Sequence, residues 1–173
     1  LRRHTRAMHT AERRRLKSHE ETIASIFVSM HIEFTSEFVV KAKTFAARKS
    51  ARIDFYIQRP WGFVLFEVDE MQHSAYRVLH EVQRMEALRD YHLKHFPGMR
   101  VHTVRYNTHA WKQDGEVHKP THEERKAKIQ ECLEYVPEAR FEISYVFYRT
   151  QCGRLVIPDH PEFTLEKFTR IIT

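Results

Sequence analysis

The stretch from Phe63 to His73, FVLFEVDEMQH, changes character halfway along. Its first half is an apolar run of the kind that forms a buried β-strand, and its second half carries three carboxylates and a histidine. Carboxylates crowded at the end of a buried strand repel one another and lose hydration, so they persist mainly where a cation, a proton or a basic partner offsets the cost. The stretch therefore predicts a metal site at the end of a buried strand.

The segment just before this stretch predicts a partner strand. Residues 53–57 alternate apolar and polar side chains, which places Asp54 on one face and Ile53, Phe55 and Ile57 on the other. The turn at 60–62, Pro-Trp-Gly, returns the chain into the acidic strand, so the two strands form an antiparallel hairpin. This pairing would bring Asp54 beside Glu67.

The predicted strands also indicate which groups could hold the metal. Glu67 and Asp69 share a face because side chains two apart along a strand point the same way. The carboxylates of Asp54 and Glu67, with the Val68 carbonyl, would leave positions open for water and a phosphate oxygen, which suits Mg²⁺. His73, one turn beyond the strand, could act as general base, general acid or phosphate donor.

Length and composition bound the class of protein. A chain of 173 residues fits one domain with helical additions, and a charged fraction of 30% with no apolar run near ~20 residues indicates a folded, soluble protein and no membrane span. Two cysteines are too few for a disulfide scaffold, which favours an intracellular protein, nuclear or cytoplasmic. A net charge of +6 favours polyanionic partners. A start at Leu1 rather than Met is compatible with a fragment of a longer protein.

Basic residues gather in two segments. Residues 1–17 form an arginine-rich arm or helix that is either solvated or in contact with phosphate. A second basic segment connects two predicted strands, and we expect phosphate contacts there from Lys41, Lys43, Arg48, Lys49 and Arg52. Arg105, at the end of a later strand, is either a phosphate contact or a solvated or paired arginine.

Periodicity and capping signals give an alternating order of helices and strands. A central mixed sheet flanked by helices, an α/β fold, is expected over residues 18–157, followed by a C-terminal tail or helix over 158–173. The predicted elements are a helix over 19–30, a strand over 31–40, the hairpin, a helix over 74–96, a strand over 100–106 running parallel to its neighbour, a polar loop over 107–120, a helix capped by Thr121 and Glu124, and a strand over 141–147.

The order of acidic groups along these elements resembles that of a known nuclease superfamily. Glu20 or Glu21 lies on a first helix, Asp54 on a hairpin strand and Glu67-Val68-Asp69 on the next, followed by Glu70-Met71-Gln72-His73 before a helix. This order resembles the PD-(D/E)xK, or restriction-endonuclease-like, superfamily, and is closer in style to the very-short-patch repair endonucleases and related eukaryotic and giant-virus proteins. The likeness covers roughly residues 19–148, and in those closer relatives Glu81, Arg84 and Arg105-Tyr106-Asn107 also match.

The resemblance implies a restriction-endonuclease-like core and an Mg²⁺- or Mn²⁺-dependent endonuclease that hydrolyses DNA phosphodiester bonds, with RNA as a second candidate substrate. Asp54 and Glu67 would bind the metal with the Val68 carbonyl, and His73 would assist proton transfer. Glu21 would reach a metal-bound water in addition to capping its helix. The residues implied to support the site are Glu70, Gln72, Glu81 and Arg84, of which Glu70 has a simpler role as a helix cap and Glu81 and Arg84 as an intrahelical ion pair.

One position departs from the superfamily pattern. Asp69 occupies the place of the motif lysine, so no ammonium is available there to orient the attacking water. His73 or Gln72 substitutes for it, or Asp69 joins the metal shell, or the fold has lost catalysis. The alternative function is therefore a non-cutting module of the same fold that binds nucleic acid or a protein partner. A zinc protein that uses several of the 13 histidines has little support because no HExxH or paired Cys/His spacing occurs.

Overall fold

A computed structural model of the chain describes residues 18–41, 50–69, 78–113, 116–147 and 169–172. It comprises two compact units, residues 1–33 and 34–173. The described part of the first unit is a helix over residues 18–29, close to the predicted bounds of 19–30, and its apolar side chains Ile23, Ile26 and Phe27 are buried. None of the described helices is long and apolar enough to cross a membrane.

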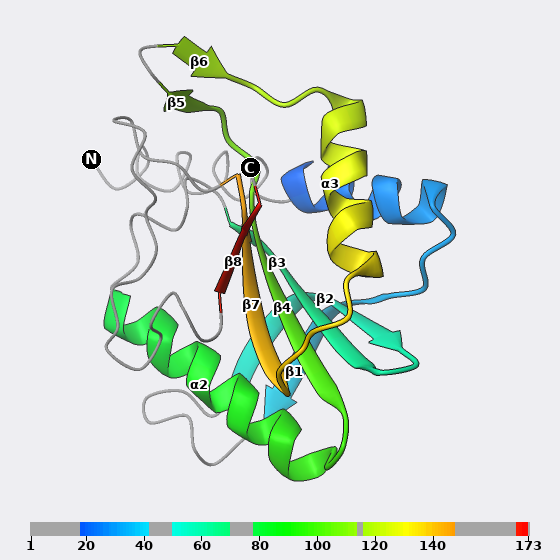
Figure 1. Ribbon diagram of the computed structural model, residues 1–173, viewed down its shortest axis with the longest axis vertical. Coiled ribbons are helices and arrows are strands. Elements are labelled where there is room, and N and C mark those ends of the chain that lie inside the picture. Colours follow the sequence, from blue (N-terminus) through cyan, green and yellow to red (C-terminus); the bar gives the residue numbers. More distant parts are fainter. Residues whose placement is uncertain (1–17, 42–49, 70–77, 114–115, 148–168, 173) are drawn as a thin grey trace, which may run out of the picture. The chain divides into compact units, whose positions relative to one another are not determined.

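The second unit is built on a six-stranded sheet with the strand order β1-β2-β3-β4-β7-β8 (Figure 1). The pairs β1–β2 and β2–β3 are antiparallel, whereas β3, β4, β7 and β8 run parallel to one another. The strands are β1 (Thr35–Lys41), β2 (Ser50–Arg59), β3 (Gly62–Asp69), β4 (Arg100–Asn107), β7 (Phe141–Val146) and β8 (Thr169–Ile172).

The described part of the second unit also contains two helices, α2 (Val78–His95) and α3 (His122–Glu134). The α2 side of the sheet holds a core in which Met85 and Leu88 meet Leu65 of β3 and residues of the neighbouring strands. The α3 side holds Tyr106, whose hydroxyl accepts a hydrogen bond from Arg125 of α3. Because alternate residues of a strand face opposite sides, the two helices lie on opposite faces. The predicted α/β class, with a mixed sheet flanked by helices, is confirmed.

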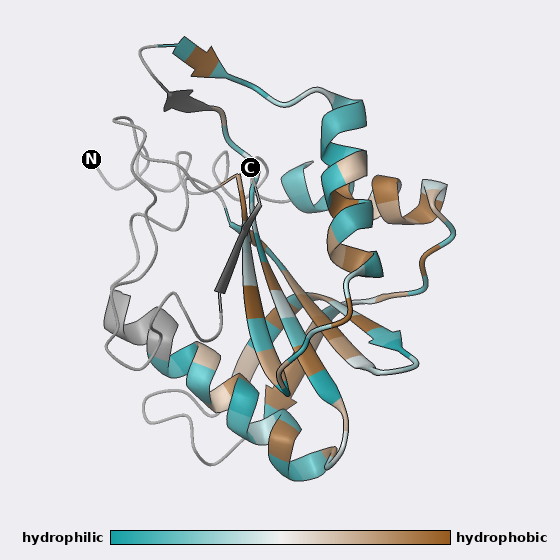
Figure 2. Cartoon of the chain, viewed as in Figure 1, coloured by the Kyte–Doolittle hydropathy of each residue, from teal (hydrophilic) through white to brown (hydrophobic). Residues whose placement is uncertain are grey.

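The strands at the centre of the sheet are buried on both faces. Every described side chain of β3 and β7 is buried, which is typical of parallel strands covered by helices. Figure 2 shows apolar residues running through the centre of the sheet and mostly hydrophilic residues along α3. Gly62 begins β3 with a φ of 152°, and a Cβ there would lie 1.9 Å from the carbonyl oxygen of Arg100, so only glycine allows β3 to approach β4 at this point.

The β1–β2 ladder is interrupted opposite Asp54. The residue pairs before and after this point follow the same register, but Glu37 and Asp54, which that register would place opposite each other, are not paired. Glu37 has a left-handed φ of 52°. Ile53 joins the core on the α2 side, whereas Phe55 contacts Phe66 on the opposite face. The predicted single face for Ile53 and Phe55 is therefore wrong, because the interruption breaks the alternation at Asp54.

Several predicted boundaries also need correction. The strand predicted over 31–40 begins only at Thr35, and the connection predicted to end at Arg52 ends earlier because β2 begins at Ser50. The polar loop predicted over 107–120 contains a separate hairpin of two short strands, β5 (Trp111–Gln113) and β6 (Glu116–His118). Residues 169–172, for which a tail or helix was predicted, form strand β8. The remaining expected elements are confirmed: the β2–β3 hairpin, the parallel β3–β4 pair, the strand at β7, and the capping box of α3.

Candidate functional site

The carboxyl ends of β3 and β4 bring four polar side chains to one face of the sheet. The parallel register pairs Glu67 with Arg105 and Asp69 with Asn107, and all four are buried. These positions share the face of Leu65, so they lie on the α2 side. Ligand sites in open α/β sheets lie at the carboxyl ends of the parallel strands, and we call this group the carboxyl edge.

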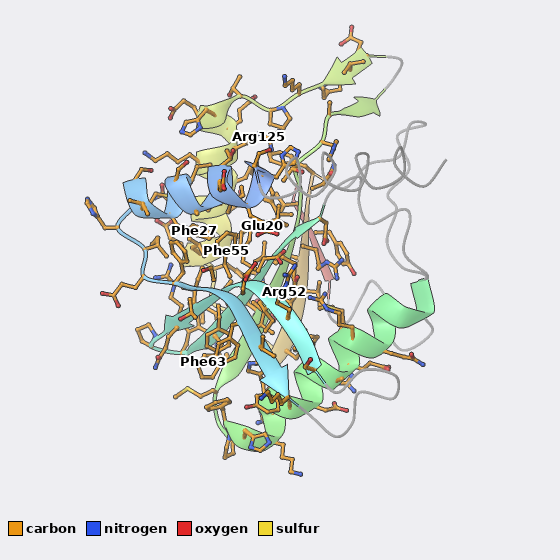
Figure 3. All side chains as sticks on the ribbon, turned by 180° about the vertical axis from the view of Figure 1, so that it is seen from behind. Glu20, Phe27, Arg52, Phe55, Phe63 and Arg125 are labelled. Carbon is orange, nitrogen blue, oxygen red and sulfur yellow. The ribbon has the colours of Figure 1, made fainter. Side chains whose placement is uncertain are left out.

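Glu67 is bound by an arginine from α2. Arg84 Nη2 donates to Glu67 Oε1 at 2.5 Å and also to the backbone carbonyl oxygen of Arg52, again at 2.5 Å. The side chain of Glu67 is 3% exposed and that of Arg84 is 21% exposed. One guanidinium therefore joins α2 to both β2 and β3 and supplies a counter-charge to a carboxylate that has left water. Arg52, labelled in Figure 3, lies on β2.

Asp69 is bound by an arginine from the next strand. Arg105 Nε donates to Asp69 Oδ2, and Arg105 Nη1 lies 3.5 Å from the Met85 sulfur of α2. Neither side chain of this ion pair is more than 4% exposed. The sequence left open whether Arg105 contacts phosphate, is solvated or is paired; in the structure it is paired with the carboxylate of Asp69. Asp69 cannot supply the ammonium that the superfamily has at this position, and a guanidinium lies beside it instead.

Asp54 also lies at the carboxyl edge, but its carboxylate lies in the plane of the sheet, between β2 and β3. Its Oδ2 accepts a hydrogen bond from the backbone N–H of Val68 at 2.8 Å. The paired residues Phe55 and Phe66 are the last of the β2–β3 ladder, so the Asp54 carboxylate takes over where the backbone pairing ends. The expectation that Asp54 lies beside Glu67 is confirmed, and the interruption of the β1–β2 ladder is what lets it turn toward β3.

The proximity of the two carboxylates changes the acidity of Glu67. The pKa of Glu67 is raised to about 7, chiefly by burial; the charge of Arg84 lowers it, the nearby charge of Asp54 raises it, and Arg105 lowers it. A carboxyl group with a pKa of about 7 is half protonated at neutral pH. Perturbation by burial and by a second carboxylate is common at functional sites.

The outer rim of the carboxyl edge is formed by Asn107, the last residue of β4, and by residues that follow it. Asn107 donates through Nδ2 to the Phe147 carbonyl at 2.8 Å, and its Oδ1 accepts from the His109 N–H at 3.1 Å. Arg125 of α3 donates through Nη2 to the Thr108 carbonyl at 2.9 Å. Sequence reasoning did not select Arg125 or Thr108, because nothing in the pattern of α3 indicates that its second turn touches the end of β4.

Some predicted site residues lie outside the described residues, so their places in the site stay predictions. These are Glu70, Gln72, His73, Lys43, Arg48 and Lys49, together with the side chain of Glu81. Lys41 and Glu21 are exposed, and Glu21 lies in the first unit. The Arg52 side chain is exposed and forms an ion pair with Glu37 at 3.5 Å. The proposed intrahelical partner of Arg84 is untested, whereas its contact with Glu67 was not predicted.

Whether a divalent cation suits this place can be judged from its donors. Among the described residues no group of three or more His, Cys, Asp or Glu side chains has metal-binding geometry. Two carboxylates on adjacent strands, Asp54 and Glu67, do lie near enough for the charge of Asp54 to oppose ionisation of Glu67. A divalent cation would relieve that repulsion, and two carboxylates with water and phosphate oxygens are an ordinary Mg²⁺ shell. The donors fit such an ion provided that Arg84 releases Glu67 Oε1.

No family model, curated protein or solved structure matches this chain.

Proposed function

We propose that the protein is an Mg²⁺- or Mn²⁺-dependent endonuclease that acts on DNA, with a restriction-endonuclease-like core. The observation that carries the proposal is the placement of two carboxylates, Asp54 and Glu67, on adjacent strands at the carboxyl edge, near enough for their charges to interact. Asp54 accepts a hydrogen bond from the Val68 N–H, and its charge raises the pKa of the adjacent buried Glu67. Two carboxylates at the ends of neighbouring strands can hold the divalent cation that metal-assisted phosphodiester hydrolysis uses.

The residues at this edge would have separate roles. Asp54 and Glu67 would hold the cation, with the Val68 carbonyl as a further ligand, and the bound ion would stabilise charge on the phosphate and lower the pKa of an attacking water. His73 would transfer a proton. Arg84 and Arg105 would orient Glu67 and Asp69 through the ion pairs described above.

A non-cutting module of the same fold is the second candidate, and one observation favours it. Glu67 and Asp69 each have an arginine as counter-ion, and the position of the motif lysine carries Asp69. Such a site is electrostatically satisfied without a metal. In that case the carboxyl edge would stabilise the fold, and binding of nucleic acid or a protein partner would take place without hydrolysis.

A cleavage assay separates the two functions. Supercoiled plasmid, single-stranded DNA and RNA are incubated with wild type in Mg²⁺, Mn²⁺ or EDTA, beside Asp54→Asn, Glu67→Gln and His73→Ala. We expect metal-dependent cutting of DNA that the first two variants lose and that His73→Ala slows by ~10²–10⁴-fold. The matched control is Glu142→Gln, since Glu142 is a buried carboxylate on β7 that is held by Tyr135 and lies away from the carboxyl edge.

Two outcomes would contradict the endonuclease. One is a wild type that folds and cuts none of the three substrates with either metal. The other is an Asp54→Asn variant that cuts as fast as wild type. Either result would make the non-cutting module the better account.

A further inference from the structure

We infer that Arg125, on the second turn of α3, binds a backbone phosphate of the DNA strand that crosses the carboxyl edge, an assignment that rests on the proposed function. The guanidinium of Arg125 is half-buried and held by two oxygens at the end of β4. Nη1 donates to the Tyr106 hydroxyl at 3.3 Å, and Nη2 donates to the Thr108 carbonyl at 2.9 Å. Figure 3 labels Arg125 on α3.

The charge of Arg125 distinguishes it from the other arginines at this edge. Arg84 and Arg105 are each paired with a carboxyl group, that of Glu67 and that of Asp69 respectively. Among the described residues Arg125 has no carboxylate partner, and both of its hydrogen-bond acceptors are neutral oxygens. A half-buried cation without a counter-ion is costly in the free protein, so an incoming anion gains more there than at a fully solvated lysine.

The position of Arg125 links this charge to the proposed site. Its two acceptors, on Tyr106 and Thr108, flank Asn107, which is paired in register with Asp69. Tyr106 faces the α3 side of the sheet, whereas Arg105 faces the α2 side, because adjacent residues of a strand alternate. A DNA strand that crosses the carboxyl edge from the α2 side to the α3 side would pass Arg125, so one of its phosphates could bind there.

The two hydrogen bonds of Arg125 also fix its orientation. A guanidinium has five N–H donors, so two directed at the end of β4 leave others for a phosphate oxygen. Pre-orientation reduces the side-chain entropy that binding has to overcome, and a planar fork is suited to two phosphate oxygens at once. The capping box of α3, in which Thr121 and Glu124 satisfy each other's backbone N–H groups, holds the turn from which Arg125 extends.

The chain offers a matched control in Arg100. It lies at the opposite end of β4, is likewise half-buried, and donates through Nη1 to the Pro137 carbonyl at 2.7 Å. It also lacks a carboxylate partner among the described residues. Arg100→Gln therefore removes the same charge from the same strand, but about one strand length from the carboxyl edge.

Binding is measured in EDTA, so that the result does not depend on cleavage. The probe is a fluorescein-labelled DNA duplex, and fluorescence anisotropy is followed over a series of KCl concentrations for wild type, Arg125→Gln, Arg125→Lys and Arg100→Gln. We expect Arg125→Gln to weaken binding roughly tenfold at low salt. The slope of log K against log salt should become shallower by ~0.9, the loss of one neutralised phosphate. Arg125→Lys should keep the slope, and Arg100→Gln should keep both affinity and slope.

A chemical measurement keeps the inference testable if Arg125→Gln does not fold. Wild type is treated with phenylglyoxal, an arginine-selective reagent, with and without the duplex, and modified peptides are identified by mass spectrometry. DNA should protect Arg125 and leave Arg100 reactive. Equal modification of Arg125 in both samples, an unchanged salt slope in a folded Arg125→Gln, or failure of wild type to bind the duplex would each overturn the inference. If DNA protects Arg125 but wild type cuts none of the substrates, the phosphate contact of Arg125 would be upheld and the proposed endonuclease activity would be rejected.

Discussion

The two ends of the layer between the sheet and α2 bury polar groups in different ways. At the carboxyl edge Glu67 and Asp69 are buried as partners of Arg84 and Arg105. At the opposite end His92 is 1% exposed and lies among aromatic rings, including those of Tyr56, Phe63 and Phe96 at centroid distances of 5.8, 5.8 and 6.0 Å. Figure 3 shows Phe63, which belongs to this aromatic end.

His92 is neutral for a geometric reason. Its Nδ1 lies 2.7 Å from the Leu88 carbonyl oxygen, which can only accept, so Nδ1 carries the proton. Nε2 is buried and has no hydrogen-bond partner among the described residues. Burial therefore lowers the pKa of His92, the Leu88 carbonyl opposes this in part, and the nearby His95 lowers it further. Protonation would place a second N–H against aromatic carbon.

The comparison shows which end is specialised for charge. The aromatic end excludes charge and stabilises the fold by packing, whereas the carboxyl edge keeps two carboxylates buried and supplies each with a cation. Replacing a buried ion pair by apolar groups is often neutral or stabilising, so such pairs are weak evidence of a purely structural role. Among the residues that the structure describes, buried ion pairs of this layer occur at the carboxyl edge, and the proposed site would explain that placement.

The largest effect should come from breaking the Asp69–Arg105 pair. Arg105→Met leaves the Asp69 carboxylate buried without its counter-ion, and we expect a loss of roughly 3–5 kcal/mol in the free energy of unfolding. Urea denaturation measures this directly. The double variant Arg105→Met with Asp69→Leu should recover most of the loss, since neither charge is then buried. A loss below 1 kcal/mol for the single variant would show that Asp69 is hydrated and that the carboxyl edge is open to water.

An effect of intermediate size is expected when pH is varied. The contributions of Glu67 at the carboxyl edge and of His92 at the aromatic end to the free energy of unfolding should change with pH in opposite directions. Between pH 4.5 and about 7 the folded chain keeps a proton on Glu67 that the unfolded chain has lost, so this group makes stability fall as pH rises. Below pH 6.5 the unfolded chain binds a proton on His92 that the folded chain does not, so this group makes stability fall as pH falls. Each contributes at most ~1.4 kcal/mol per pH unit.

Two variants measured in EDTA isolate these contributions. Relative to wild type, Glu67→Gln should gain stability as pH rises from 4.5 to 7, and His92→Phe should gain stability as pH falls below 6.5. At pH 8 His92→Phe should differ from wild type by less than ~1.5 kcal/mol, because a ring of similar size replaces a neutral ring. Parallel pH profiles for wild type and both variants would contradict the contrast between the two ends.

The sequence was informative where a residue's role depends on its own strand. The alternation and the turn at 60–62 were enough for the β2–β3 hairpin and for Asp54 beside Glu67. The contacts of Arg84 and Arg125 were missed because each joins elements far apart in the sequence, 17 residues from Arg84 to Glu67 and 19 from Tyr106 to Arg125. The sequence also did not indicate that the alternation of faces breaks at Asp54. The left-handed residue opposite it is Glu37 and not a glycine, so no glycine marks the interruption.

The most direct test of the central claim is a titration of the protein with Mn²⁺, with the electron paramagnetic resonance signal of the free ion as the readout. Wild type should bind Mn²⁺ saturably at one site, and Mg²⁺ should displace it. Asp54→Asn and Glu67→Gln should lose that site, whereas Glu142→Gln should retain it. The account would be contradicted by a wild type that leaves millimolar Mn²⁺ free, or by an Asp54→Asn variant that binds the ion as tightly as wild type.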